Sequence, residues 1–533
     1  MSKFLISKDR LLPVVVSLLA GACGTNRPEP KQARPVARQT RRAPKPKLKF
    51  HPIAKLPRPV IRPRITVLQE PGSTELDIRV VFRAGSADDP KGKEGLTCLA
   101  ANLMAEGGAG NQTWAQIIDT LYPMSGRLSV QCGKDVTVIS GRVHRDFALP
   151  FMAIFQDILL RPKFEPKAFD RVKKQTLDEI QKELRYDSDE DLGKAALEVF
   201  LYQGHPYGRP ADGTVTGLNA ITLDDVKAQA KNVFVVQRVL AGLAGTVRPV
   251  DRASLEAALM KLPSNAQPRA TLPPAPSIKG LHVLVVDKKS LGSAISIGLP
   301  IDVKRSDPDF AALALAASYL GEHRQSSGVL YHRMRTLRGL NYGDYAYTEY
   351  FHQVGWGRLP MVNVTRRQQF FSIWIRPVDR SKAHFALRFA LRELARFIRD
   401  GIPPEKFDRA KRFLAGYSRL WVQTPDRRLG FALDARFYHM GSYPTSLSRA
   451  LATLTPEQVK AAVARHWSAT NLKVVVVASD ASTLANAIRK DQPSPITYDS
   501  PKPASILAED RIVSQYPLHP IEVKVVPVDR MFQ

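Results

Sequence analysis

The chain has 533 residues, of which 44% are hydrophobic, so it is too long for one ordinary domain and apolar enough to bury substantial cores. This composition excludes general disorder and suggests roughly two to four domains. The net charge of +28 first suggests nucleic acid or an anionic surface as a partner, but thirteen Lys or Arg residues and a single Glu lie within residues 24–64 alone. Because no basic motif interleaved with aromatic residues follows, we do not expect nucleic-acid binding.

Residues 1–23 are typical of an export signal, with a cationic start, a short apolar run and a small-residue ending. The ending Leu18-Leu19-Ala20-Gly21-Ala22-Cys23 is similar to a bacterial lipobox, which predicts that Cys23 is the lipidated first residue of the mature chain. Cleavage by the ordinary signal peptidase is the alternative. Because Gly24 rather than Asp follows the cysteine, the similarity to lipoproteins predicts an exported protein anchored in the outer membrane and facing the periplasm.

Residues 24–64 hold nine prolines, many of them beside Arg or Lys. Such a segment cannot bury a core and favours extended polyproline conformations. It is predicted to be a stiff basic tether, either solvated without a specific partner or attracted to an anionic leaflet by up to about 1 kcal/mol per cation.

A first αβ domain is expected over residues 65–262, because strand-like alternation and helix-like periodicity succeed each other there. A Pro- and Ala-rich linker is expected over residues 263–280. Strands are predicted at 66–68, 76–82, 127–132, 135–143 and 238–245, and helices after residue 94 and at 147–160, 166–184, 190–202 and 222–232.

A second domain, residues 281–490, repeats the first. Pro166-Lys167-Ala168-Phe169-Asp170-Arg171 reappears 238 residues later as Pro404-Glu405-Lys406-Phe407-Asp408-Arg409, and residues 221–227 reappear 233 residues later as 454–460. The helix near residues 97–107 likewise has a counterpart near 313–323. The Pro-rich tail, residues 491–533, ends in a β-like run that either adds an edge strand or remains mobile, and we assign it no function.

Two segments give this duplicated order of elements a family resemblance. They are Gly95-Leu96-Thr97-Cys98-Leu99-Ala100-Ala101-Asn102, which follows a strand end and a turn, and Gly204-His205-Pro206-Tyr207-Gly208. Together with the repeat, they resemble the insulinase/pitrilysin family of zinc peptidases over roughly residues 65–484. The resemblance implies an α+β fold in which two duplicated αβ domains form a clam-shell half chamber.

In that family the first helix carries the zinc motif His-x-x-Glu-His, because positions i and i+4 share one helix face and the Glu activates the zinc-bound water. On this pattern Cys98 takes the place of the first His, Ala101 of the catalytic Glu and Asn102 of the second His. The third ligand of the family is a Glu about 77 residues further on, where this chain has Glu179. No catalytic residue is therefore intact, and no cofactor is expected in this chain.

Two interpretations of Cys98 and Glu179 stay open from the sequence. A thiolate is a good zinc ligand, so Cys98 and Glu179 are candidates for a rebuilt metal site, although loss of the base alone would raise the barrier by about 4 kcal/mol or more. Alternatively, Cys98 is a small buried residue, and Glu179 is a surface charge or pairs with an Arg. Whether Cys98 pairs with Cys132 is not decided by the sequence.

The second domain contains Met334-Arg335-Thr336-Leu337-Arg338-Gly339-Leu340-Asn341-Tyr342, which looks like the family signature Leu-Arg-x-x-x-Gly-Leu-x-Tyr. In family members this Arg and this Tyr hold the substrate backbone across the chamber, which implies a substrate-binding role for Arg335 and Tyr342. The alternative is that Arg335 is a surface cation and Tyr342 one of several strand aromatics.

Other chemistry is not favoured. His205 is interpreted as structural because it lies in a Pro- and Gly-rich turn, and Gly-x-Ser-x-Gly is absent. A catalytic triad built on His144 and Asp146, or on Ser326 and Ser327, therefore has no support in the sequence. The two serines are instead expected to cap a helix that starts at Gly328.

The resemblance implies an exported, non-catalytic subunit of a heteromeric zinc peptidase acting on peptides. Its implied partners are a homologous subunit with an intact zinc motif, which would hold the zinc, a peptide substrate, and the membrane through the lipid anchor. Two alternatives remain: an envelope binding or scaffold protein without a peptidase role, and a peptidase with the rebuilt metal site.

Overall fold

The computed structural model describes residues 63–264, 268–322, 326–352, 357 and 359–533. The predicted signal, Cys23 and nearly all of the tether lie outside the described residues. No helix within the described ranges is both long and apolar enough to cross a membrane.

The first half is built on a five-stranded sheet whose strands lie in the order β1-β5-β2-β4-β3. β1 pairs parallel with β5, and the remaining neighbours are antiparallel. β2 is buried over nearly its whole length, whereas β3 is a half-exposed edge strand. The strands are β1 (Ile65–Gln69), β2 (Glu75–Phe82), β3 (Arg127–Cys132), β4 (Thr137–His144) and β5 (Val239–Gly245).

The second half repeats this sheet and adds one strand. Its order is β11-β6-β10-β7-β9-β8, so that β6 to β8 reproduce the first sheet strand for strand, including the parallel pair at one side. The duplication inferred from the sequence is therefore confirmed by the topology. The strands are β6 (Leu281–Asp287), β7 (Gly292–Ile301), β8 (Asp344–Tyr347), β9 (Gln369–Asp379), β10 (Leu472–Ala478) and β11 (Pro520–Pro527).

The repeated sequence segments begin equivalent helices. α4 and α11 start at the repeated prolines, whose fixed φ suits the first helical position. α7 and α14 both follow a Thr cap whose hydroxyl accepts a backbone N–H in a capping box. The first-half helices are α1 (Leu96–Glu106), α2 (Trp114–Leu121), α3 (Ala148–Leu160), α4 (Pro166–Asp178), α5 (Asp189–Leu201), α6 (Val215–Ala220), α7 (Leu223–Val233) and α8 (Pro249–Leu259); the later ones are α9 (Phe310–Gly321), α10 (Ala383–Asp400), α11 (Pro404–Leu420), α12 (Pro425–Phe437), α13 (Tyr443–Thr453), α14 (Pro456–His466), α15 (Ala481–Arg489) and α16 (Ala504–Ser514).

Two of the predicted helices contain π-helical segments. The helix expected at 166–184 ends as α4 and continues as a π-helix, η4 (Glu179–Asp187). The helix expected from Gly328 contains a second π-helix, η6 (Tyr331–Thr336). Apolar residues spaced like Ile180 and Leu184 are compatible with an α-helix and with a π-helix. The hydrophobic periodicity therefore could not distinguish the two.

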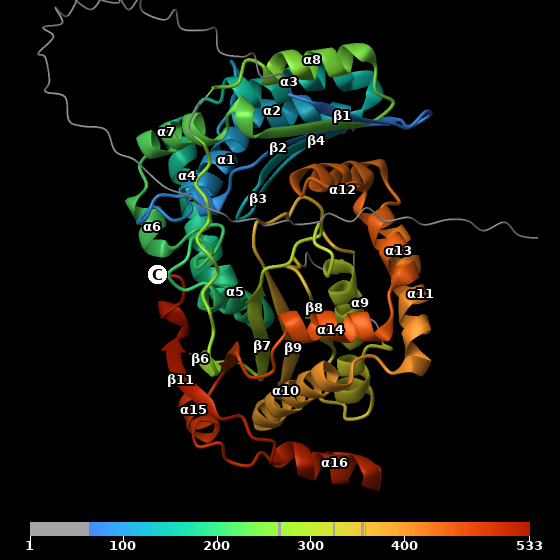
Figure 1. The fold of residues 1–533 in the computed structure, drawn as a ribbon. Helices are drawn as coiled ribbons and strands as arrows, with labels where there is room; N and C mark the ends of the chain where they lie inside the picture. Colours follow the sequence, from blue (N-terminus) through green and yellow to red (C-terminus); the bar gives the residue numbers. More distant parts are fainter. Residues whose placement is uncertain (1–62, 265–267, 323–325, 353–356, 358) are drawn as a thin grey trace, which may run out of the picture. The chain divides into compact units, whose positions relative to one another are not determined.

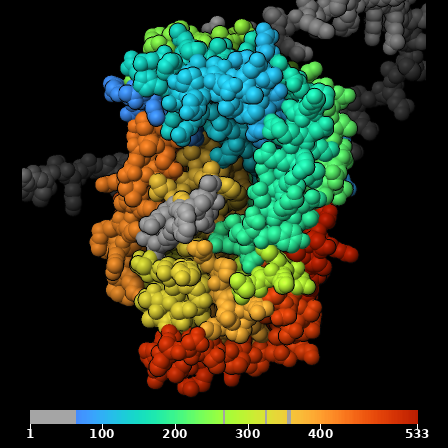
Figure 2. Space-filling view, turned by 180° about the vertical axis from the view of Figure 1, so that it is seen from behind, coloured from blue at the N-terminus to red at the C-terminus, as the bar shows by residue number. Residues whose placement is uncertain are grey.

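The two halves exchange helices. α5 of the first half packs on β7 and β10 of the second sheet, and α12 of the second half packs on β5 and β1 of the first sheet (Figure 1). Leu429 and Leu433 of α12 share an apolar cluster with Val81 and Leu240 of the first sheet. Figure 2 shows the turquoise surface of the segment around residues 160–200 reaching from the blue first half towards the red C-terminal segment. Each half thus covers the other's sheet.

Buried ion pairs join the halves at the same junction. The Glu198 carboxylate of α5 accepts from the Arg366 guanidinium at 2.9 Å and lies 3.3 Å from the Lys134 ammonium. Burial raises the pKa of Glu198, but these two cations outweigh it and lower the pKa overall. Asp135 forms a second centre, with Arg269 and Arg367 each at 2.8 Å.

The C-terminal tail adds an edge strand, which is one of the two alternatives left open by the sequence. β11 pairs parallel with β6. The chain then returns to the first half, where Met531 and Phe532 join the apolar core and the Arg185 Nε donates to the Met531 carbonyl at 2.9 Å. The tail is therefore a strap across both halves.

We predict that Glu198→Gln lowers the free energy of unfolding by about 3–5 kcal/mol, because it leaves Lys134 and Arg366 as buried cations without a carboxylate. Denaturant unfolding followed by circular dichroism measures the change. The matched control, Asp157→Asn, breaks an exposed pair with Arg161 and is expected to cost less than about 1 kcal/mol. Equal losses in the two variants would contradict the role given to Glu198.

Candidate functional site

The helix that carries three of the predicted site positions is fixed at its start by one carboxylate. Gly95 precedes α1 with a φ of 103°, a conformation that favours glycine, and an added Cβ would lie 2.5 Å from the Asp212 carbonyl oxygen. Asp89 accepts hydrogen bonds from the backbone N–H groups of Gly95 and Thr97, each at 2.8 Å. Burial raises the pKa of Asp89 to about 6. The two hydrogen bonds to Asp89 thus fix the start of α1.

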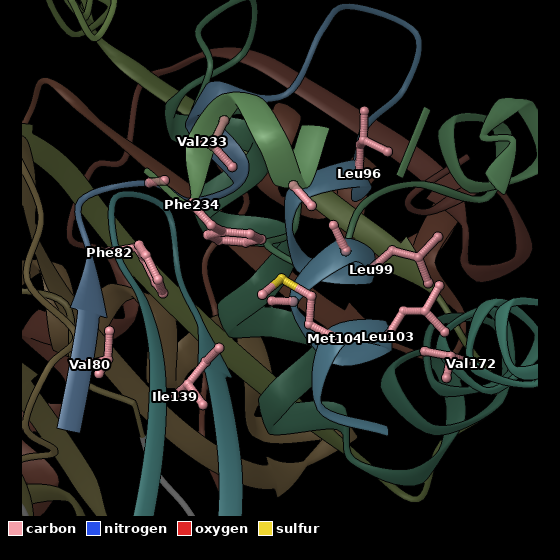
Figure 3. Packing of buried hydrophobic residues seen from close by; sticks show 14 of the residues in the cluster. Val80, Phe82, Leu96, Leu99, Leu103, Met104, Ile139, Val172, Val233 and Phe234 are labelled. Carbon is pink, nitrogen blue, oxygen red and sulfur yellow. The ribbon is translucent and has the colours of Figure 1, made fainter. Parts of the chain in front are cut away.

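α1 is embedded in the main apolar cluster of the first half (Figure 3). Leu99 and Leu103 of α1 are buried in this cluster, together with Phe82 of β2 and Phe234 at the end of α7. Ala101, at the position of the family's catalytic Glu, is completely buried. The position of the base is therefore occupied by a methyl group within the core.

Cys98 forms a disulfide with Cys132 at the end of β3, with a Cα–Cα distance of 5.4 Å. The question that the sequence left open is thus answered. Zinc takes the thiolate form of cysteine, and a disulfide sulfur has no thiolate to offer. The first ligand position is covalently closed, and the rebuilt metal site of Cys98 and Glu179 loses one of its two donors.

Glu179 stands at the first residue of η4 and is half-buried. Its carboxylate accepts a hydrogen bond from the Gln175 amide at 3.4 Å, and no arginine among the described residues pairs with it, although one interpretation had expected this. Burial raises the pKa of Glu179, and the nearby Asp212 carboxylate raises it further. The third ligand position is retained as an acidic group among other acidic groups.

The residues present do not fit a zinc centre. Tetrahedral catalytic zinc needs three protein ligands and an open position. Cys98 is in a disulfide, Asn102 offers a neutral amide, and only Glu179 is a normal ligand type. Across the described ranges no group of three His, Cys, Asp or Glu side chains is arranged to hold a metal.

The alternative histidines have structural roles or no nucleophile beside them. His205 accepts from the Tyr207 backbone N–H through Nδ1 at 3.0 Å, and its Nε2 lies 3.0 Å from the Pro273 carbonyl oxygen. Both ring nitrogens are thereby used, as the structural interpretation expected. His144 Nδ1 lies 3.4 Å from an Asp146 carboxylate oxygen on the surface.

Arg335 and Tyr342 lie together in the second half. The Arg335 guanidinium lies between two rings, 4.8 Å from the centroid of Tyr331 and 5.5 Å from that of Tyr342. Tyr342 is 77% exposed. The exposed phenol of Tyr342 thus lies beside the half-buried guanidinium of Arg335, and both groups can donate to carbonyl oxygens or an oxyanion.

Sequence reasoning missed the residue that supports this pair. Arg338 is 1% exposed. It donates to Asp510 and to Glu509 of α16, both at 2.8 Å, and to the Arg333 carbonyl within η6 at 3.0 Å. These bonds fix the π-helix that carries Arg335. Nothing in the local sequence separates Arg338 from its neighbouring arginines, because its partners belong to the tail.

The two sets of predicted residues remain separate. Within the described part of the chain, no hydrogen bond, ion pair or ring contact joins Arg335 or Tyr342 to Cys98, Asn102 or Glu179. The Arg335 guanidinium instead acts on Asp344, also in the second half, where it opposes the rise of the Asp344 pKa caused by burial. The described residues thus bring together neither a metal site nor the family's complete set of catalytic positions.

Two family models match the chain: "Insulinase (Peptidase family M16)" over residues 64–214 and "Peptidase M16 inactive domain" over residues 220–414. A relative named non-peptidase homolog YmxG, from Helicobacter pylori, is 23% identical over 75% of this chain and 88% of its own. An uncharacterized zinc protease of Streptomyces coelicolor is 24% identical over 71% of this chain and 79% of its own.

Solved structures share the fold. The peptidase M16 inactive domain from Pseudomonas fluorescens matches with a TM-score of 0.68 and 24% identity, over 78% of this chain and 94% of that one. A chain of complex III from Candida albicans matches with a TM-score of 0.60 and 14% identity, over 78% and 93% of the two chains. These likenesses agree with the α+β fold of two duplicated halves.

Reduction of the Cys98–Cys132 disulfide is expected to lower the free energy of unfolding by about 3–4 kcal/mol, because it releases a loop of 34 residues in the unfolded chain. Thermal unfolding with and without dithiothreitol measures this. The double variant Cys98→Ala/Cys132→Ala should be insensitive to the reductant. A melting temperature of the native chain that dithiothreitol leaves unchanged would contradict the prediction.

Asp344 should make stability fall as pH rises. Burial raises its pKa to about 8, with a smaller opposing effect from the Asn341 hydrogen bond, whereas an unfolded Asp titrates near 4. Between these values the folded chain holds a proton that the unfolded chain has lost, so stability falls by up to about 1.4 kcal/mol per pH unit and levels off above 8. Asp344→Asn removes this contribution, and the free energy of unfolding from pH 5 to 8 measures it.

The variant should keep some pH dependence, because burial also raises the pKa of Glu322 to about 7. Identical pH profiles for the native chain and Asp344→Asn would show that Asp344 does not titrate as described.

Proposed function

Because the chain belongs to the insulinase (M16) family of peptidases, we propose that it is a non-catalytic subunit that presents Arg335 and Tyr342 to a peptide bound by a homologous, zinc-containing partner. The proposal rests on a contrast between the zinc-motif positions on α1 and the substrate-binding positions Arg335 and Tyr342 in the second half. The first zinc position is held in a disulfide and the position of the base is filled by a buried methyl group, whereas Tyr342 is 77% exposed with the Arg335 guanidinium 5.5 Å from its ring centroid.

The proposal includes a partner subunit for a physical reason. A guanidinium and a phenol that donate outwards contribute binding energy only when another molecule supplies the acceptors. The likeness to a chain of complex III2 from Candida albicans supports a role within a complex. In this proposal zinc and the catalytic base belong to the partner, and this chain holds no cofactor of its own.

We place the protein outside the cytoplasm as a lipoprotein. The signal-like residues 1–23 and the lipobox-like ending at Cys23 support export and anchoring in the outer membrane, facing the periplasm. The Cys98–Cys132 disulfide supports an oxidising compartment independently.

A second candidate is an envelope binding or scaffold protein without a peptidase partner. It is favoured by the likeness to a relative that is itself named a non-peptidase homologue. The two candidates differ in whether a partner with an intact motif gains activity from this chain.

The test is reconstitution with the product of a neighbouring gene that encodes His-x-x-Glu-His in a similar chain. We expect no cleavage of fluorogenic peptides by this chain alone, cleavage by the mixture, and a loss of about 100-fold in kcat/KM with Arg335→Ala. The control Arg419→Ala removes an exposed arginine of α11 and should leave the rate unchanged.

Cleavage by this chain alone that a chelator abolishes would refute the proposal. A mixture that cleaves no faster than the partner alone would favour the scaffold candidate, and an unchanged rate of the mixture with Arg335→Ala would refute the role given to Arg335.

A further inference from the structure

Six arginines gather where the start of β5, the end of α12 and the linker meet. Two neighbouring cavities lie there, of about 880 and 500 Å³, and they share Arg83, Gln237 and His439. None of the predicted zinc or substrate positions lines either cavity. We call this region the arginine furrow and define it by Arg64, Arg83, Arg238, Arg269, Arg367 and Arg436.

Three arginines of the furrow share two carboxylates. Arg238 lies 3.2 Å from Asp88, and Arg269 lies 2.6 Å from the same carboxylate. Arg269 also contacts Asp135 at 2.8 Å, as does Arg367. This side of the furrow therefore keeps one positive charge in excess.

The other three arginines have no carboxylate partner among the described residues. Arg83 donates through Nη2 to the Gln237 carbonyl at 2.9 Å, and its buried Nε has no partner. Arg436 donates to the Arg64 carbonyl at 2.6 Å and to the Thr66 hydroxyl at 3.0 Å. Neutral acceptors thus orient these guanidinium groups without neutralising them.

The guanidinium groups are close enough to repel one another. Burial lowers the pKa of Arg83, and the charges of Arg269 and Arg238 lower it further. The pKa of Arg436 is lowered by burial and then by Arg64 and Arg83. Half-buried like charges of this kind are unfavourable in the free chain, and an anion bound between them removes the repulsion.

We propose that the arginine furrow binds a phosphoryl group. The planar fork of a guanidinium matches phosphate oxygens in pairs, and several forks at one place suit an anion that accepts from more than one side. The larger cavity exceeds the size of a bare phosphate and is also lined by Val235, Leu272 and Phe437. The ligand therefore has a phosphoryl group on a partly apolar body, as phospholipid headgroups and soluble phosphate esters do.

The test compares binding by the full mature chain and by the double variant Arg83→Gln/Arg436→Gln. Calorimetry with inorganic pyrophosphate probes soluble phosphates, and sedimentation with phosphatidylglycerol vesicles, against phosphatidylcholine vesicles, probes a headgroup. We expect the double variant to bind at least one of these probes ~10-fold more weakly or worse. Loss in the pyrophosphate arm assigns a soluble phosphate, and loss in the vesicle arm alone assigns a lipid headgroup.

The matched control is Lys490→Gln/Arg511→Gln, which removes two exposed charges from the α15 and α16 region, away from α12 and β1 in Figure 1. It also corrects for attraction of the basic tether to vesicles, because both double variants keep the tether. Equal binding by the two double variants in both arms would overturn the proposal. Hexaglutamate binding as tightly as pyrophosphate would overturn it as well, in favour of an acidic peptide.

Stability separates a binding role from a structural one. Without ligand, the Arg83→Gln/Arg436→Gln variant should melt no lower than the native chain, because the substitutions relieve repulsion. A clear fall in melting temperature without ligand would show that these arginines serve the fold, and would count against the site.

Discussion

The exchange of helices between the two halves is the constraint on which the rest of the molecule depends. Each sheet has a face that only the other half covers, since α5 packs on the second sheet and α12 on the first. The buried ion pairs of Glu198 and Asp135 lie at this junction and fix the halves in register. Because η4 leads directly into α5, the position of Glu179 is set by the same packing.

Within that frame, the family's site has been divided. α1 keeps its fixed start at Asp89 and its buried face, yet the position of the first ligand now forms a covalent link to β3 and the position of the base lies in the core. The second half keeps Arg335 on a π-helix that the tail holds through Arg338, and Tyr342 lies between that helix and β8. The residues at the former metal site therefore stabilise the fold, whereas Arg335 and Tyr342 remain as hydrogen-bond donors at the former substrate site.

Much of the fold could be predicted because local signals repeat. The prolines at the starts of α4 and α11, and the Thr caps of α7 and α14, recur at nearly constant offsets, and the same sheet order follows. The helices α2 and α8 were not anticipated.

Features that depend on distant contacts were not predictable. The pairing of Cys98 with Cys132 needs the packing of α1 against β3, and Arg338 finds its carboxylates in a tail far along the chain. The arginine furrow is likewise assembled from six separate places in the chain, so the sequence alone does not show its excess of positive charge.

The most direct test of the account is the zinc content of the purified chain after dialysis against zinc without reductant. The account predicts no stoichiometric zinc, and the same residual amount in the native chain and in Glu179→Gln. One zinc per chain that is lost with Glu179→Gln would contradict it, because the family's metal site would then still be working.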